Sequence, residues 1–243
     1  MSAEKTLEIL DLFNFQTREL NVPQIAEKLN QPQSSVYRHL RVLKEKGYLI
    51  ESNGGLYKLG YRFLELAKIV KTDSSISSIA FPIMRNLTNE TGETSILTIV
   101  SGLNAICLEV ITSPEPIKVS SDQGKILPLY AGASSIALLA HMPSETVDEL
   151  SRLELLKSFT VNTIVDPEQL KGKLEETRNR GYAISDSEVD DGVIAYGVPI
   201  RDMDNQVVAA VSIAGPSERM LKKDERSLID CLQLAKDQIE KYL

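Results

Sequence analysis

The chain has 243 residues, of which 42% are hydrophobic and 25% are charged, a composition typical of a soluble globular protein with one large or two small domains. Cys107 and Cys231 form no CxxC pair, and His39 and His141 are the only histidines, which argues against a zinc site, a His-rich metal site and a disulfide framework. The sequence shows no secretion signal, and no apolar run approaches the roughly 20 residues that cross a bilayer. We therefore expect a cytoplasmic protein with no membrane segment and no metal or other cofactor.

Charge is distributed unevenly along the chain. Residues 1–72 contain 11 Lys and Arg against 8 Asp and Glu, whereas residues 73–243 contain 16 against 26. A basic segment joined to an acidic one suggests that the first part meets a polyanion and the second does not. The basic excess is modest, so chance is the alternative explanation.

The N-terminal part begins with two helical patterns. Apolar residues at helical spacing predict a first helix around residues 7–13. The stretch "NVPQIAEKLN" (21–30) predicts a second helix, in which Asn21 caps the N-terminus and Pro23 occupies the first turn. The break "NQP" ends this helix.

A third helix and a hairpin follow. The helix is predicted over residues 33–46, with Gly47 at its C-terminal end. Two strand-like runs, 48–50 and 56–59, flank the turn "ESNGG". The order helix, helix, turn, helix and hairpin predicts a winged helix-turn-helix DNA-binding domain over residues 1–60.

The third helix has an apolar stripe and a polar face. Val36, Leu40 and Leu43 share the stripe and are expected to face the core, with His39 packed beside them. In a helix-turn-helix the polar face enters the major groove, where Arg can bind guanine and Gln or Ser can reach bases or phosphates. With one Lys from the wing, the predicted DNA contacts are Gln33, Ser34, Ser35, Tyr37, Arg38, Arg41 and Lys58. An isolated helix of this kind is usually just solvated, but the neighbouring elements and the basic balance favour DNA binding.

A linker and a second domain are predicted next. The linker helix covers residues 61–76 and runs into the Ser-rich break "DSSISS" (73–78). The segment 79–92 predicts the opening helix of a domain that covers residues 77–243.

The second domain mixes strands and helices. Strands are predicted at 94–100, 105–112, 116–121, 182–185, 193–200 and 206–215. Helices are predicted at 133–142, 144–156, 167–180 and 224–242. The turn "RDMDNQ" joins the last two strands as a hairpin, so we expect an α+β fold with a largely antiparallel sheet.

Small side chains cover one face of each of the last two predicted strands. Alternation along the strands places these residues together: Val193, Ala195, Gly197 and Pro199 on one strand, and Val208, Ala210, Ser212 and Ala214 on the next. Such faces leave room for a ligand. Close packing of a helix on the sheet also needs small residues and is the alternative.

The helix predicted at 133–142 begins with two serines. Its free N–H groups would form an anion site, to which Ser134 or Ser135 could add hydroxyl donors. A plain serine N-cap is the alternative.

The sequence gives little support for catalysis. It contains no GxSxG, P-loop or HExxH motif. Glu188, Asp190 and Asp191 in "SDSEVDD" suggest a cation site, but the run lacks the glycine and the ligand spacing of an EF-hand loop. We expect a solvated loop there, and we expect no enzyme.

Four stretches, in order along essentially the whole chain, resemble the IclR-type transcriptional regulators. They are "SAEKTLEILDLF", "VPQIAEKLNQPQSSVYRHLRVLKEKGYLIESNGGLYKLG", "LPLYAGASSIALLA" and "RNRGYAISDSEVDDGVIAYGVPIRDMDNQVVAAVSIAGP". The last is the most specific, and the third has Tyr130 near a position where the family usually has His. The resemblance implies a GAF-like effector-binding domain, dimers or tetramers, and transcription controlled by a ligand.

The resemblance also implies a set of effector contacts. Matched by position, they are Ala133, Ser134, Ser185, Ala195, Ser212 and Ala214. Some members have a carboxylate where this chain has Ser185, and some have Ser in place of Ala214, so the ligand itself stays open. We expect a regulator, with repression as the favoured mode, that binds palindromic double-stranded operator DNA as a homodimer or homotetramer and responds to a small organic acid. A DNA-binding protein whose second domain only oligomerises is the alternative.

Overall fold

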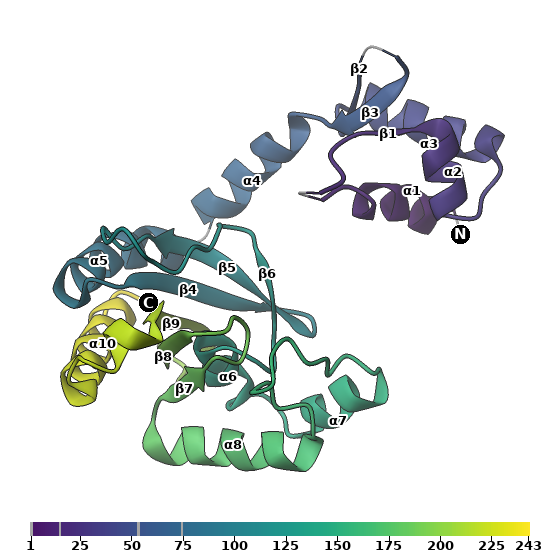
Figure 1. Ribbon diagram of the computed structural model, residues 1–243. Helices are drawn as coiled ribbons and strands as arrows, with labels where there is room; N and C mark the ends of the chain where they lie inside the picture. The colour runs from purple at the N-terminus through teal and green to yellow at the C-terminus, as the bar shows by residue number, and fades with distance from the viewer. Residues whose placement is uncertain (1, 15, 53, 74) are drawn as a thin grey trace. The chain divides into compact units, whose positions relative to one another are not determined.

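The computed structural model describes residues 2–14, 16–52, 54–73 and 75–243, and the chain divides into two compact units, Met1–Ser74 and Ser75–Leu243 (Figure 1). Each unit has its own buried apolar core. Within the described ranges, no helix is long and apolar enough to cross a membrane.

The first unit is a winged helix-turn-helix. Its elements are α1 (Ser2–Asp11), β1 (Leu20–Asn21), α2 (Val22–Lys28), α3 (Gln33–Glu45), β2 (Leu49–Ser52), β3 (Leu56–Leu59) and α4 (Arg62–Asp73). The strands form an antiparallel sheet in the order β1-β3-β2, in which β2 and β3 are the predicted hairpin. The sequence does not predict β1, because its two residues show no alternation and become a strand only by pairing with Tyr57 and Leu56.

The predicted start of the second helix is confirmed. The Asn21 side chain accepts a hydrogen bond from Gln24 N at 3.0 Å, and the Gln24 side chain accepts one from Asn21 N at 2.9 Å. This reciprocal capping box satisfies two N–H groups that a helix start leaves free. At the hairpin turn, Gly54 and Gly55 have φ of +83° and +74°, a backbone region that favours glycine. Asn53 of the same predicted turn lies outside the described residues.

The apolar stripe of α3 is buried as predicted. Val36, Leu40 and Leu43 pack into the first unit's core, which also takes Ile9 from α1 and Ile25 from α2. Full burial of each such side chain stabilises the fold by about 1.5–3 kcal/mol. The polar face of α3 is therefore left for contacts outside the unit.

The first helix of the second unit begins earlier than the sequence predicts. Helix α5 (Ser75–Thr91) starts within the Ser-rich break, whereas residue 79 is the predicted start. Ser77 is buried, and its hydroxyl donates to Glu109 Oε1 at 2.5 Å, so a distant partner satisfies a residue that reads locally as a helix breaker. Ser74, within the predicted break, lies outside the described residues.

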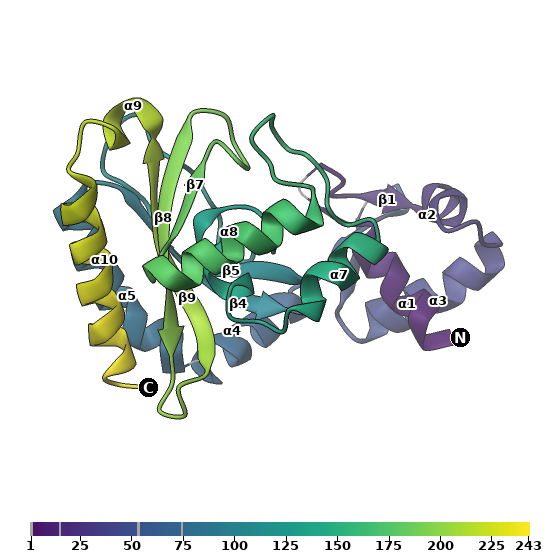
Figure 2. The same cartoon turned by 90° about the horizontal axis from the view of Figure 1, so that it is seen from below.

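An antiparallel sheet between helices forms the second unit. After α5 come β4 (Thr94–Ser101), β5 (Asn104–Ile111), β6 (Ile126–Pro128), α6 (Ala133–Leu139), α7 (Glu145–Arg152), α8 (Pro167–Arg180), β7 (Ala183–Asp186), β8 (Val193–Arg201), β9 (Val207–Pro216), α9 (Ser217–Met220) and α10 (Glu225–Glu240). The sheet has six strands in the order β6-β5-β4-β9-β8-β7, and every neighbouring pair is antiparallel. Helices α5 and α10 lie side by side on one face, and α6 packs on the other with α8 beyond it (Figures 1 and 2).

The prediction of a strand at residues 116–121 is wrong. These residues form no strand, and the next strand is β6. The carbonyl of Ile117 accepts a hydrogen bond from Arg219 Nη1 at 2.7 Å, and that of Val119 accepts one from Thr94 Oγ1 at 2.8 Å. Side chains distant in sequence thus bond backbone groups that a sheet neighbour would otherwise pair with.

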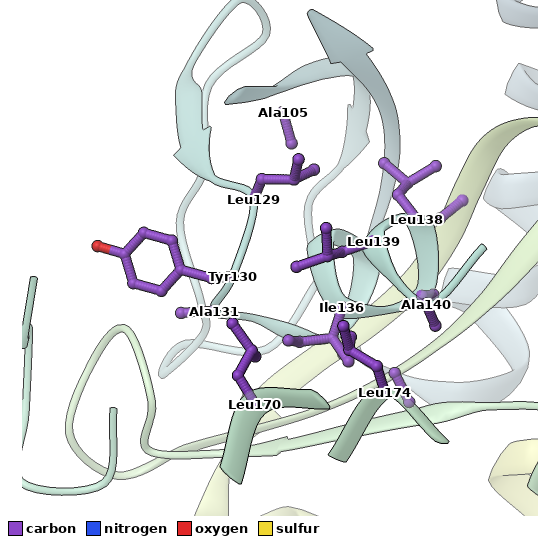
Figure 3. Packing of buried hydrophobic residues seen from close by; sticks show 14 of the residues in the cluster. Ala105, Leu129, Tyr130, Ala131, Ile136, Leu138, Leu139, Ala140, Leu170 and Leu174 are labelled. Atoms are coloured by element: carbon purple, nitrogen blue, oxygen red, sulfur yellow. The ribbon is translucent and has the colours of Figure 1, made fainter. Parts of the chain in front are cut away.

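The small-residue faces of β8 and β9 point toward α6. Ala195, Ala210 and Ala214 belong to the core on that side, whereas Tyr196 and Val211 belong to the core under α5 and α10. The α6 side also contains Leu138 and Leu139 of α6 and Leu170 and Leu174 of α8 (Figure 3). The alternation predicted for these strands is therefore confirmed for these residues. It is wrong for Val208, which is exposed, because the pairing register of β8 and β9 shifts at Ile200/Arg201 and Val207 packs against the α6-side core instead.

Helix α6 packs very closely on the sheet at one glycine. A Cβ atom on Gly197 would lie 2.8 Å from the backbone carbonyl of Ala133, the first residue of α6. At Gly197, the small residue is therefore needed for close packing of the helix on the sheet, which is the alternative given for the small-residue faces. This packing also brings the start of α6 to the part of the sheet where a pocket opens.

Candidate functional site

The polar face of α3 is exposed. Gln33, Ser34, Tyr37, Arg38 and Arg41 are exposed and Ser35 is half-buried; Lys58 is exposed on β3. Tyr37 keeps 55% of its surface accessible, which is high for an aromatic side chain. The structure thus leaves the predicted DNA contacts accessible, six on α3 and one on the wing.

Local contacts of α3 leave its two arginines available. Arg38 has no ion pair among the residues that the structure describes, and Arg41 Nε lies 3.6 Å from Glu45 Oε1. Both members of that pair are well exposed, so the pair contributes little and does not hold Arg41 away from a phosphate or a base. His39 is buried, and its Nδ1 lies 2.8 Å from Thr6 Oγ1, which supports the prediction that it is packed.

A pocket in the second unit contains all six residues that the resemblance implies. Strands supply its base, the start of α6 and the loop after β7 supply one side, and the segment before β6 supplies another. The six residues are Ala133, Ser134, Ser185, Ala195, Ser212 and Ala214. The pocket has a cavity volume of about 80 Å³. By the same measure one ordered water needs about 10–15 Å³, so a small organic molecule fits.

A carboxylate of the protein itself lies at the start of α6. Glu188 Oε2 accepts a hydrogen bond from Gly132 N at 3.2 Å, and its other oxygen is paired with Lys173. Thr163 Oγ1 donates to the Glu188 carbonyl at 2.6 Å. Glu188 is buried, so the prediction of a solvated loop is wrong for this residue, although Asp190 and Asp191 are exposed. The reason is tertiary, because the partners of Glu188 come from distant segments.

Neither serine caps α6. The N-cap is Gly132, with φ +87°, and no side chain caps the helix, so the plain serine cap is wrong. Ser134 Oγ accepts a hydrogen bond from Thr98 Oγ1 at 2.9 Å. The Ser135 hydroxyl is buried and has no hydrogen-bond partner in the described ranges. Because buried polar groups nearly always have partners, this hydroxyl is suited to bond a ligand or a water.

Lys125 adds a positive charge at the pocket. It lines the pocket and is exposed, and the described part of the chain offers it no ion pair. The other charged groups there are Asp190 and the Glu188 carboxylate, which is paired with Lys173. A ligand carboxylate would therefore find a free cation as well as neutral hydroxyl groups.

Two family models match the chain. The first, bacterial transcriptional regulator IclR C-terminal, matches residues 69–241, and the second, the IclR helix-turn-helix domain, matches residues 2–51. The chain belongs to the IclR family of bacterial transcriptional regulators.

Relatives that cover most or all of the chain agree with the IclR assignment. The HTH-type transcriptional regulator KipR of Bacillus subtilis is 33% identical over 211 residues, 87% of this chain and 84% of KipR. The solved IclR structure from Thermotoga maritima has a TM-score of 0.72 and 32% identity, and covers 99% of this chain and 97% of that one. An IclR homolog from Microbacterium hydrocarbonoxydans, solved in complex with 4-hydroxybenzoate, has a TM-score of 0.85 at 23% identity, with 100% and 99% covered.

As an IclR-family member, the protein is a helix-turn-helix DNA-binding regulator of transcription and not an enzyme. This confirms the predicted class and rules out the enzyme alternative. Among the described residues, no group of three His, Cys, Asp or Glu is placed to hold a metal ion.

Sequence reasoning missed several pocket residues of this IclR-family protein. Ile96, Ser121, Lys125 and Gly132 line the pocket but belong to none of the predicted site positions. Gly132 alone had a local signal, since a glycine directly before a helix often takes an unusual backbone angle. The others lie on segments whose meeting depends on the sheet order.

Proposed function

We propose that a small organic acid binds the pocket and changes the affinity of this IclR-family regulator for its operator. The observation that carries the proposal is that one pocket is lined by all six residues that the family resemblance implies. Ser135 also lines that pocket, and its buried hydroxyl has no hydrogen-bond partner among the residues that the structure describes. A domain that only oligomerises has no need of such a cavity.

The chemistry of the walls supports an acid with an apolar part. Lys125 provides a positive charge, and Ser185 and Ser212 add hydroxyl groups. Ala195, Ala214 and Ile96 form apolar surface. This mixture of mostly apolar lining and few polar groups is typical of small-molecule sites. The IclR homolog solved in complex with 4-hydroxybenzoate shows that this fold can bind an organic acid. At 23% identity, that likeness supports the same fold and not the same ligand.

On the DNA side, we propose that two first units of a homodimer or homotetramer read the half-sites of a palindrome through α3. Exposed Arg38 and Arg41 would contact bases, and Lys58 in the wing would contact phosphate. We propose repression as the mode, because a regulator that occupies an operator excludes other proteins from that DNA.

Calorimetry and thermal denaturation test the ligand proposal. A panel of keto acids, sugar acids and aromatic acids is titrated into the full-length protein. At least one acid should release or absorb heat and raise the melting temperature, because a ligand that binds only the folded state stabilises it. A panel that gives neither signal would favour the alternative in which the second domain only oligomerises.

A further inference from the structure

One wall of the pocket is a segment without regular structure. We call residues 113–121, between β5 and the turn that precedes β6, the strap. Val119, Ser120 and Ser121 of the strap line the pocket. Ser113 is buried and Val119 is half-buried, whereas Pro114–Lys118 between them are exposed. Contacts at a few residues therefore hold the strap against the rest of the unit. These contacts determine the position of this wall of the pocket.

The buried side chain of Thr94 fixes the strap at two of these residues. Its Oγ1 donates to the Val119 carbonyl at 2.8 Å and accepts from Ser113 N at 3.1 Å. Thr94 itself is held in β4, opposite the pocket residue Ala214 on β9. One hydroxyl thus ties both ends of the exposed part of the strap to the sheet that forms the base of the pocket.

Arg219 fixes the strap from the other side. Its Nη1 donates to the Ile117 carbonyl at 2.7 Å. Its Nε and Nη2 donate to the two carboxylate oxygens of Glu93 at 2.7 and 2.5 Å. Glu93 is fully buried and is also paired with Lys223. A bidentate pair of this kind fixes the guanidinium in one orientation, which leaves its third nitrogen aimed at the strap.

We propose that Thr94 and Arg219 are positioning residues that hold the strap closed over the pocket and thereby set ligand affinity. Neither residue lines the pocket, so each acts through the wall and not by contact with a ligand. Their bonds replace the sheet pairing that the strap lacks. The role in ligand affinity rests on the proposed function, whereas closure of the strap does not.

Cys107 reports on strap closure. Its side chain is fully buried, its Sγ lies 3.4 Å from Ser121 Oγ, and burial raises the pKa of the thiol. A thiol reagent therefore reaches Cys107 only when the structure around it opens locally. The other cysteine, Cys231, is half-buried and could also react. The experiment therefore starts from the variant Cys231→Ser, which we call the parent.

The experiment measures the rate at which 5,5′-dithiobis(2-nitrobenzoate) labels Cys107 in this parent, without any ligand. Thr94→Val keeps the shape of the side chain and removes both hydrogen bonds, so labelling should be roughly five- to tenfold faster. Thr94→Ser keeps the hydroxyl and should label at the parent rate. Thr112→Val, at an exposed threonine next to the strap, is the matched control and should change nothing.

A second pair of variants tests Arg219. Arg219→Lys keeps a charge beside Glu93 but cannot bond the carboxylate in two places and the Ile117 carbonyl together, so labelling should again accelerate. Arg226→Lys, at an exposed arginine of α10, is its control. Melting temperatures are measured for every variant, so that faster labelling at an unchanged melting temperature identifies local opening.

Labelling at the parent rate in both Thr94→Val and Arg219→Lys would overturn the positioning role. Should Thr94→Val not fold, the comparison of the two arginine variants decides. An acid that binds the parent should bind Thr94→Val roughly tenfold more weakly and Thr94→Ser equally well; equal binding to all three would overturn the link to ligand affinity. Failure of the whole acid panel to bind would overturn the proposed function and leave the labelling result intact.

Discussion

At the scale of single residues, Glu93 of the second unit is a buried carboxylate that two cations hold in place. It is fully buried, and a Cβ on Gly215 would lie 2.3 Å from its Oε2. Burial alone would raise its pKa, but hydrogen bonds and charges from Arg219 and Lys223 outweigh burial and lower the pKa below its ordinary value. The folded state thus stabilises the ionised form of Glu93.

The lowered pKa of Glu93 predicts how stability depends on pH. A carboxylate whose pKa is lower in the folded state stabilises the fold above its unfolded pKa, and this contribution is lost as the pH falls through the folded pKa. Glu93→Gln should lower the free energy of unfolding at pH 7 by about 1–3 kcal/mol, because the half-buried Arg219 and Lys223 lose their charged partner. Urea unfolding should show that cost shrinking below about pH 4. Glu218→Gln, at an exposed neighbour of Arg219, should have little effect; equal stability of wild type and Glu93→Gln at pH 7 would contradict this account.

A second prediction at this scale concerns the two exposed arginines of α3 and the affinity of the protein for operator DNA. Arg38→Ala and Arg41→Ala should each weaken operator binding by about 1–3 kcal/mol, since a bidentate contact to guanine has this value. Both side chains are exposed, so melting temperatures should stay unchanged. Fluorescence anisotropy at a stated salt concentration measures the loss. Lys46→Ala, at the exposed C-cap of α3, is the control, and wild-type affinity in both arginine variants would show that α3 does not dock as proposed.

At the scale of secondary-structure elements, the contact between α6 and β8 decides whether the pocket exists. Gly197→Ala would place a Cβ 2.8 Å from the Ala133 backbone, so the helix must shift. We expect a loss of about 1–3 kcal/mol in stability, typical of an overpacked core, together with weaker ligand binding.

A matched glycine in a helix gives the control for Gly197. At Gly172, in the middle of α8, an added Cβ would meet nothing within 4 Å. Gly172→Ala should therefore be neutral or stabilise the protein by up to about 1 kcal/mol, since alanine favours a helix. Thermal denaturation of the two variants compares them directly. A stable, ligand-binding Gly197→Ala protein would mean that α6 does not need this close approach.

Elements with local signals could be predicted from the sequence, and those made by distant contacts could not. Helix α8 has its predicted bounds, because Asp166 caps its start by accepting from Gln169 N at 2.9 Å and Gly181 ends it with φ +83°. In contrast, β1 exists only through its pairing with β3. Residues 116–121 of the strap have the sequence pattern of a strand but form none, because side chains distant in the sequence bond their carbonyl groups.

The same distinction holds for the pocket. Alternation along β8 and β9 could be read directly, so the small-residue faces were predictable, and the family resemblance supplied the six positions. Lys125, Glu188 and Ser121 could not be assigned, because they reach the pocket only after β5, β6 and the loop after β7 have taken their places in the sheet.

At the scale of the whole molecule, the central proposal is that a ligand in the second unit changes DNA binding by the first. A ligand can shift this equilibrium only as far as its affinities for the two states differ, and such couplings are typically 1–3 kcal/mol, or about 5- to 150-fold. Helix α4 and helix α5 adjoin along the chain, so they are the segment through which the two units are covalently coupled.

Ala195→Leu provides the variant that separates ligand sensing from DNA binding. Ala195 lines the pocket on β8 of the second unit, whereas α3 and the wing belong to the first unit. A leucine there would occupy much of a cavity of about 80 Å³, so it should block the ligand and leave DNA affinity without ligand unchanged. Val208→Leu, at a partly exposed position of β9 that does not line the pocket, is the matched control.

The measurement that tests the central proposal most directly is a mobility-shift titration on the DNA upstream of the protein's own gene, at one stated salt concentration, with and without each acid of the panel. We predict that at least one acid changes the operator affinity of wild type and of Val208→Leu by about fivefold or more. The same acid should leave the operator affinity of Ala195→Leu unchanged. Operator affinity that no acid alters, or an equal response in Ala195→Leu, would contradict the proposal.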